Sequence, residues 1–374
     1  MEIDKLFPPG VSPYKGESME IILAMALFAA PLIGFYTPLW PDGWTIYRDR
    51  TLLLFSIPLL SMIFFIEPAF GIIFSLLLVR YDFTLEGLHG PAVWAFAFTL
   101  WLWLTHLDKQ YAPLILTAIV LAACTQIGFA FVDFANLHIR KQKGQSETPV
   151  CGTLGNRTYL AAYLAIVAPI VAVPKLWWLL LLFFVAVLMC ASRGGLLAFM
   201  VGVLVAWPKI AMPIIIIGGI VLLLMIFKHN VFLLNHVLAS ASAKKQILNT
   251  IKSRKQVWLL TLAYTLQWPH WLIGRGFNSF NKCAIKWVSM YGVKEGFMHA
   301  HNDGLQFFFE YGLLGLAALG LFTWKLSFGM AFGHSLTGSV AALITVSMFT
   351  FPHHIGPVAV TVLAILAMLS IGVI

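Results

Sequence analysis

The densest cluster of titratable side chains in this chain lies in the stretch HAHNDGLQFFFEYGLLG, residues 299–315. His301 has an imidazole that can accept a proton near neutral pH at its ordinary pKa. Glu310 follows inside an apolar helix, where a carboxylate is expensive unless it is paired or faces a wet cavity. These residue types suit general base chemistry, in which His301 accepts a proton and Glu310 orients His301 or a neighbouring arginine.

The residues between them allow two interpretations. Asp303 as an N-cap, with Gln306 three residues later, matches a capping box at the start of a helix. Alternatively, Asn302 and Asp303 contact a substrate, and the sequence leaves both open. A metal site at His299 and His301 is not expected, because no cysteine or carboxylate ligands follow at suitable spacing.

Three arginines are candidates for binding an anion. Arg193 lies in CASRGGLLAF between two apolar segments, where it either serves a site or reaches to lipid headgroups. Arg254 lies on a predicted amphipathic helix over residues 246–265, where headgroup attraction is the alternative role. Trp258, one turn later, packs over the guanidinium or belongs to an interfacial aromatic belt.

Arg275 stands between two glycines in GRGFNSF, residues 274–280. A single G-x-G is weak support for phosphate binding, although glycine permits close approach of the backbone. Together, Arg193, Arg254 and Arg275 offer planar bidentate forks that suit a diphosphate. The Gly-rich stretch CGTLGNRTYLAAYLA, residues 151–165, adds Asn156, which either caps the next helix or contacts substrate.

The composition indicates which kind of fold must position these residues. The chain has 374 residues, of which 60% are hydrophobic and 10% charged, whereas soluble domains have about 45–50% and 25%. We therefore predict an all-α, polytopic integral membrane bundle of about 12 transmembrane helices (11 or 12), because several apolar runs approach the roughly 17–25 residues that cross a bilayer. The run over 19–36 is expected to be a retained span, since it lacks a basic leader and a cleavage site. The predicted spans are 19–36, 51–66, 68–79, 90–105, 112–134, 158–173, 176–191, 194–207, 210–227, 305–324, 337–351 and 355–374.

These spans divide the chain into an N-terminal bundle (1–227, about nine spans), a basic loop (228–304) and C-terminal helices (305–374). The loop carries ten Lys or Arg against two acidic residues, so it holds eight of the chain's nine net positive charges. Either the loop is cytoplasmic under the positive-inside rule, or it is a long external loop whose charge serves an anionic substrate. If there are twelve spans, the loop lies on the side of the membrane opposite to the termini.

Four stretches together resemble the O-antigen ligase/polymerase family of bacterial membrane glycosyltransferases. They are GTLGNRTYLAAYLA, SRGGLLAF, the helix from Arg254 to Trp258 that continues to WPHWLIGRGFNSF, and, most specifically, HAHNDGLQFFFEYGLLG. They cover roughly residues 150–320. The sequence departs from the family at Arg157-Thr158, which replaces an Asn region, and at Arg275, where the family often has an apolar residue.

The resemblance implies an enzyme of the bacterial inner membrane with a periplasm-facing site and an extended periplasmic loop that contains short helices. Its donor would be a glycan on undecaprenyl diphosphate, and its acceptor lipid A–core or a growing glycan. It implies no metal, no other cofactor and no nucleic acid partner beyond these substrates and membrane lipids. The family's motif histidine corresponds to His301, and its basic residues correspond to Arg193 and Arg254.

The chemistry expected from the resemblance is an inverting transfer of the glycan to an acceptor hydroxyl. The arginines would stabilise the leaving diphosphate, and His301 would act as the general base. A protein O-oligosaccharyltransferase of the same family is an alternative. A transporter or flippase for an anionic polyprenyl lipid is another, but it predicts charges near the bilayer midplane instead of at one surface.

Overall fold

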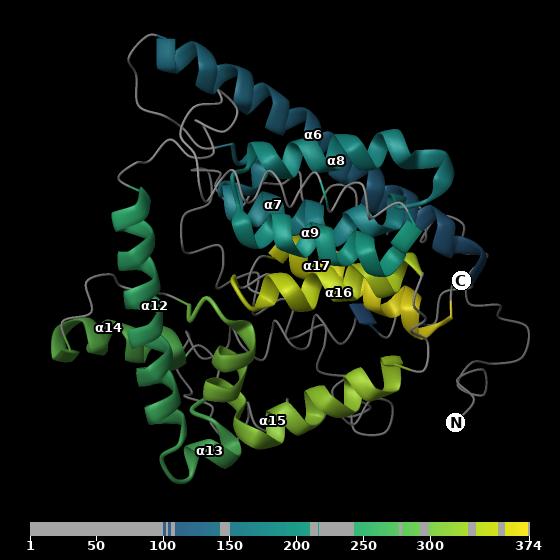
Figure 1. Cartoon of the computed structure of the whole chain (residues 1–374). Helices are drawn as coiled ribbons and strands as arrows, with labels where there is room; N and C mark the ends of the chain where they lie inside the picture. The colour runs from purple at the N-terminus through teal and green to yellow at the C-terminus, as the bar shows by residue number, and fades with distance from the viewer. Residues whose placement is uncertain are drawn as a thin grey trace, which may run out of the picture.

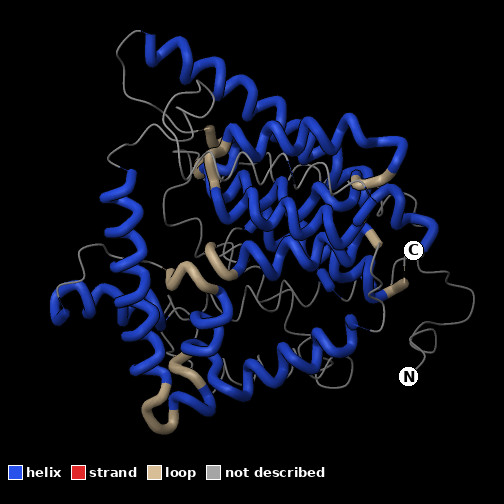
Figure 2. Tube along the Cα trace, in the orientation of Figure 1, coloured by secondary structure: helices blue, strands red, loops and turns tan. Residues whose placement is uncertain are grey.

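The structure is a computed structural model of the chain. It describes residues 100–101, 104–105, 109–142, 150–209, 216, 243–276, 279–291, 299–327, 334–350 and 356–372. The described residues form helices, turns and loops, with no strand among them (Figure 2). The predicted spans 19–36, 51–66 and 68–79 and most of 90–105 and 210–227 lie outside the described residues.

The ten α-helices that the structure describes fall into two groups (Figure 1). The bundle contains α6 (Ala112–Gln142), α7 (Arg157–Val167), α8 (Trp177–Met189), α9 (Arg193–Ala206), α16 (Ser335–Ser347) and α17 (Gly356–Ser370). Beside one end of it lie α12 (Ala243–Thr265), α13 (His270–Ile273) and α14 (Ser279–Tyr291). Helix α15 (Asp303–Ser327) joins the two groups.

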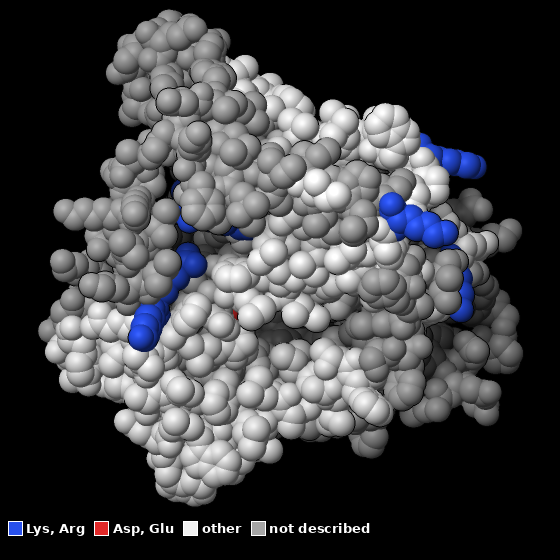
Figure 3. All heavy atoms as spheres, in the orientation of Figure 1, with Lys and Arg blue, Asp and Glu red and all other residues white. Residues whose placement is uncertain are grey.

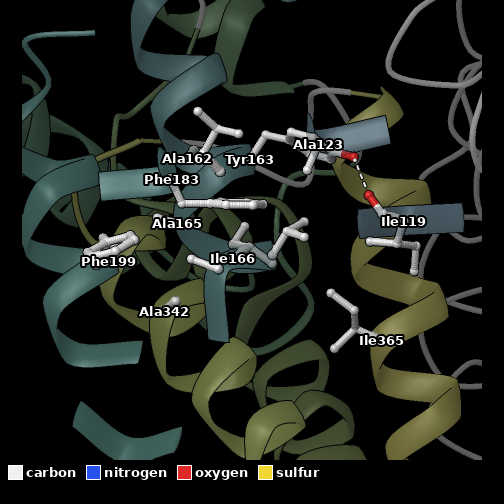
Figure 4. Close-up of a cluster of buried hydrophobic side chains, with 14 of the residues drawn as sticks. Ile119, Ala123, Ala162, Tyr163, Ala165, Ile166, Phe183, Phe199, Ala342 and Ile365 are labelled. Carbon is white, nitrogen blue, oxygen red and sulfur yellow. Dashed lines mark hydrogen bonds between the residues drawn. The ribbon is translucent and has the colours of Figure 1, made fainter. Parts of the chain in front are cut away.

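The bundle helices pack through small residues, as is common between membrane helices. Helices α9 and α16 cross at Gly202 and Gly338, where a Cβ on Gly202 would lie 2.8 Å from the Cβ of Ala342. Phe183 and Phe199 fill the space beside Tyr163, whose hydroxyl donates a hydrogen bond of 3.5 Å to the Ile119 carbonyl (Figure 4). These contacts give the site a rigid support.

Two of the described helices are long and apolar enough to cross a membrane, over Lys109–Asn136 and Asp303–Trp324. Five further apolar helices, of 10–17 residues, fall where the sequence predicts spans: Arg157–Val171, Pro174–Met189, Arg193–Ala206, Ser335–Ser347 and Val358–Ser370. The described residues are all-helical and fit a helical membrane protein, as predicted, whereas the number of about 12 spans stays a prediction.

Helix α15 differs from the single straight span predicted over 305–324. Gly312 has φ 65° and ψ −165°, which breaks the helix there. The two halves run in different directions: the first lies beside α12, and the second runs along the bundle (Figure 1). The apolar pattern of the sequence continues through the break, so periodicity alone does not reveal it.

Candidate functional site

His301 lies in the short loop that precedes α15 and has a positive φ of 52°. Few residues other than glycine adopt this left-handed conformation, and it persists only where surrounding contacts impose it. One such contact comes from α12, because the indole Nε1 of Trp258 donates a hydrogen bond of 2.7 Å to the carbonyl of Ala300. Trp258 therefore holds the residue next to His301, a role that its position in the sequence did not reveal.

Gln306, which is buried in the first turns of α15, also fixes the position of the loop. Its Oε1 accepts a hydrogen bond of 3.0 Å from the Ala300 amide. Its Nε2 donates to Glu310 Oε1 at 3.0 Å and lies 3.4 Å from His299 Nδ1. Glu310 is also buried, so this hydrogen bond meets part of the requirement that a buried carboxylate be paired.

The sequence predicts that Glu310 orients His301 or an arginine. One observed chain of hydrogen bonds runs from Glu310 through Gln306 to Ala300, the residue before His301. Gln306 is missing from the residues chosen on the sequence. Gln306 lies four residues before Glu310, so both side chains lie on one face of the helix. This spacing is the feature of the sequence that could have identified Gln306.

Arg254 and His301 belong to one site. Burial, and after it the positive charges of Arg254 and His299, together lower the pKa of His301 to about 4. This effect requires the Arg254 guanidinium to lie near the imidazole, although the two residues are far apart in the sequence. His301 is consequently neutral at neutral pH and able to accept a proton.

The start of α15 differs from the predicted capping box. The N-cap is Asn302, whose Oδ1 accepts a hydrogen bond of 3.0 Å from the Leu305 amide, so the prediction of Asp303 as the cap is wrong. Asp303 is the first helical residue and is buried. Its carboxylate lies at the positive end of the helix dipole, which stabilises a negative charge there.

The backbone around Arg275 approaches α15 at its break. The amides of Arg275 and Gly276 donate to the carbonyls of Phe309 and Glu310 at 3.0 and 2.9 Å. Gly274 (φ 71°) packs so closely that a Cβ there would overlap the backbone of Glu310. The GRG motif thus supplies donors to carbonyls of a broken helix.

The side chain of Arg275 is engaged as well. Its Nε and Nη2 donate to the Tyr264 carbonyl at 3.2 and 2.9 Å, and Nη2 also donates to Gln267 Oε1 at 2.7 Å. The guanidinium lies over the rings of Tyr264 and Phe309, at 5.3 and 5.7 Å from their centroids. These contacts favour a structural role, tying the end of α12 to α15, over the predicted contact with a diphosphate.

Arg193 is exposed and begins α9, after the N-cap Ser192. A Cβ on Gly194 would lie 3.1 Å from the Cβ of Phe349, so α9 begins beside the end of α16. This end of the bundle faces α12 and the start of α15 (Figure 1). Lys and Arg side chains border a hollow there, and others lie at the far right, where α8 begins (Figure 3).

Asn156 caps α7, because its Oδ1 accepts a hydrogen bond of 2.8 Å from the Thr158 amide. The loop before it is bound to α6 by two polar side chains that the sequence analysis missed. Asp133 Oδ2 accepts from the amides of Cys151 and Gly152 at 3.0 and 2.8 Å, and Gln126 Oε1 accepts from Thr153 at 3.2 Å. Asn156 thus has the structural role that the sequence left open.

The structure therefore joins His301, Arg254, Trp258, Gln306 and Glu310 in one connected site. Asn302 and Asp303 lie at its edge, and Arg193 begins the bundle helix that faces it. Among the described residues, no group of three His, Cys, Asp or Glu side chains is placed to hold a metal ion.

Comparison with known families gives a match over residues 178–320 to the family model described as O-antigen ligase. The matched range runs from α8 to the second half of α15 and includes each predicted site residue except Asn156. No curated protein sequence matches the chain. This match over residues 178–320 supports the resemblance of the chain to the O-antigen ligase/polymerase family.

Proposed function

We propose that this protein is a multi-pass membrane glycosyltransferase that moves a glycan from undecaprenyl diphosphate to an acceptor hydroxyl. The observation that carries the proposal is a neutral His301 held beside the cationic Arg254 in the domain shared with O-antigen ligases. The family is one of bacterial inner-membrane proteins that join glycans to lipid or polysaccharide acceptors. The periplasmic direction of the site is part of the proposal.

The reaction that this site suits is a direct displacement. The acceptor oxygen attacks the anomeric carbon while the bond from that carbon to the phosphate oxygen breaks. The diphosphate leaves with the bonding electron pair, and the hydroxyl proton passes to His301. Attack from the side opposite the diphosphate inverts the anomeric configuration, and no step of this scheme uses a metal or another cofactor.

Arg254 has two roles in this scheme. Its guanidinium stabilises the charge that develops on the leaving diphosphate, and Arg193 is the proposed second cation, from the facing end of the bundle. In the empty site, the same positive charge lowers the pKa of His301. Because a bound diphosphate neutralises that charge, the pKa of His301 rises when donor binds, and the imidazole becomes a stronger base.

The remaining residues position this pair. Trp258 and Gln306 hold Ala300 from two sides, and Glu310 fixes the amide of Gln306. Such preorganisation places the imidazole where the acceptor hydroxyl arrives without further reordering. Asn302 and Asp303 start the helix behind His301 and are the proposed secondary contacts to the acceptor.

The test is transfer by the purified protein, reconstituted in lipid vesicles with an undecaprenyl-diphosphate glycan and alternative acceptors. We expect His301→Ala to lower the rate by about 10²–10⁴-fold and Arg254→Ala by about 10²–10³-fold, while both proteins insert normally. Lys282→Ala, which removes an exposed cation on α14, is the matched control and should retain full activity.

Two results would contradict the proposal. Full transfer by His301→Ala would exclude His301 as the base. Movement of the lipid-linked glycan across the vesicle membrane without any transferred product would instead identify a flippase. Comparison of lipid A–core, glycan and protein acceptors in the same vesicles distinguishes ligase, polymerase and protein O-oligosaccharyltransferase.

A further inference from the structure

The second half of α12 has an inner face that is complete. Val257, Thr261 and Thr265 are buried, and Val257 belongs to the cluster that contains Phe280 and Trp287. The Thr261 and Thr265 hydroxyls donate to carbonyls of the same helix, each at 2.7 Å. This face therefore needs no further partner.

The outer face of the same half is apolar. Leu259, Leu262 and Leu266 are 58, 40 and 59% exposed and follow one another at helical spacing. A helix that is half covered by protein and half by water normally presents polar residues outward. Here the side facing away from the protein is a row of leucines, which indicates an apolar environment.

The row continues into the turn after α12 and into α13. Trp268 is 74% exposed and Trp271 36%, and their ring centroids lie 6.2 Å apart. We call Leu259, Leu262, Leu266, Trp268 and Trp271 the tryptophan tip. Two neighbouring exposed indoles are typical of a membrane–water interface, where their apolar and polar parts are both accommodated.

The charged residues of α12 are confined to one half of its length and not to one of its faces. Residues 243–256 carry five Lys or Arg, whereas residues 257–273 contain no Lys, Arg, Asp or Glu. The helix therefore passes from a polar environment into an apolar one along its length. In Figure 1, α12 runs past the ends of the bundle helices, and its second half lies beside the first half of α15.

The tip is continuous with the exposed surface of a membrane helix. Gly312 packs against Leu272 of α13, so α13 lies at the break of α15. Immediately after the break, Leu313 and Leu314 are 47 and 41% exposed, within the apolar segment Asp303–Trp324. Through α13, the tryptophan tip therefore adjoins the exposed surface of this apolar segment.

We propose that the tryptophan tip rests in the boundary between lipid headgroups and acyl chains, at the depth where the second half of α15 enters the bilayer. The occupant of this surface is lipid. The anchor holds the second half of α12 in place, and Arg254, just before it on the same helix, stays near the headgroup phosphates. A diphosphate carried on a membrane lipid lies at that depth, so the anchor and the site would share one level.

The test is a depth measurement on the full-length protein in nanodiscs of phosphatidylethanolamine and phosphatidylglycerol. A variant with Ser or Ala at the four native cysteines, Cys124, Cys151, Cys190 and Cys283, receives one spin-labelled cysteine at a time. The labelled variants are Trp268→Cys and Leu266→Cys at the tip, Lys282→Cys as an exposed polar control, and Leu321→Cys as a reference within the span. Collision rates with oxygen and with a water-soluble nickel chelate report the depth of each label.

At both tip positions we expect nickel collisions to be several-fold lower than at Lys282→Cys and oxygen collisions to be higher. The values should lie between those of the control and those of Leu321→Cys. Nickel collisions at the tip equal to those of the control would overturn the proposal. So would dipolar coupling between tip labels of two copies in one nanodisc, because a second copy and not lipid would then cover the surface.

Discussion

At the scale of single residues, His301 has an unusual electrostatic environment. Its neutral state at physiological pH follows from burial and from the charge of Arg254 and His299. A buried neutral imidazole beside a guanidinium is a weak base until an anion offsets the charge of that guanidinium. If His301 is the base and Arg254 binds the diphosphate, as proposed, the two roles are coupled, and pH dependence tests the coupling.

We expect transfer activity to fall as pH decreases, because protonated His301 cannot accept the hydroxyl proton. In the free enzyme the pKa of His301 is about 4, which sets the acid limb of kcat/KM. Bound diphosphate offsets Arg254, so the acid limb of kcat should appear at higher pH than that of kcat/KM. Steady-state profiles measure both limbs, and His301→Gln is the control that should remove them. An acid limb of kcat at lower pH than that of kcat/KM would contradict the coupling.

Gln306 provides a second prediction at this scale. Gln306→Ala removes the acceptor of the Ala300 amide and the donor to Glu310, which leaves buried polar groups unsatisfied at about 1–3 kcal/mol each. We expect kcat to fall by roughly tenfold or more, since the loop loses its position, with little change in KM for the donor. Gln306→Glu keeps the shape of the side chain but places a second carboxylate beside Glu310. We therefore expect its kcat to be little higher than that of Gln306→Ala. A change in KM alone would indicate direct donor binding by Gln306.

At the scale of elements, the GRG loop contacts α15 at the position where the helix breaks. Gly274 and Gly312 both have positive φ, and a Cβ at either position would overlap neighbouring backbone atoms. The amides of Arg275 and Gly276 donate to carbonyls beside the break. Irregular backbone at a membrane boundary is tolerated only with such partners.

A third prediction follows from this contact. Gly274→Ala adds a Cβ that would overlap the Glu310 backbone at a strained φ, so we expect a loss of about 1–3 kcal/mol or more in stability. Gly320→Ala on α15 is the matched control, because a Cβ there meets nothing within 4 Å. Helix propensity predicts a gain of roughly 0.5–1 kcal/mol for that control. Thermal unfolding in detergent measures both, and equal melting temperatures would argue against the close contact.

At the scale of the whole molecule, cations lie on two sides of the bundle (Figure 3). Lys175 lies before α8 at the end away from α12, whereas Lys282 lies on α14 beside the site. If the bundle helices cross the membrane, these two positions face opposite compartments. The proposed direction of the site is thus testable without any substrate.

The fourth prediction is that a cysteine at position 282 reacts with an impermeant maleimide added to intact spheroplasts, whereas one at position 175 reacts only after lysis. Both side chains are exposed, so burial does not distinguish them. The background variant without native cysteines controls for unspecific labelling. Protection of position 282 until lysis would place the site on the cytoplasmic side and exclude the periplasmic proposal.

The sequence by itself determined the class of protein and the chemistry at its disposal. A composition of 60% hydrophobic residues predicts a membrane protein, and His301, Arg254 and Glu310 stand out because charge is rare in it. These are properties of residue type and local spacing. They also sufficed to locate the helices α7, α8, α9, α16 and α17.

Only the tertiary structure decided which side chain meets which partner. Arg254 lies near enough to His301 to lower its pKa, whereas Arg275 donates to the Tyr264 carbonyl, although the sequence made both candidates for binding a phosphate. Trp258 and Gln306 became parts of the site through hydrogen bonds to the backbone of Ala300. Such contacts join α12, the GRG loop and α15 across long stretches of sequence, and backbone acceptors leave no pattern in residue types.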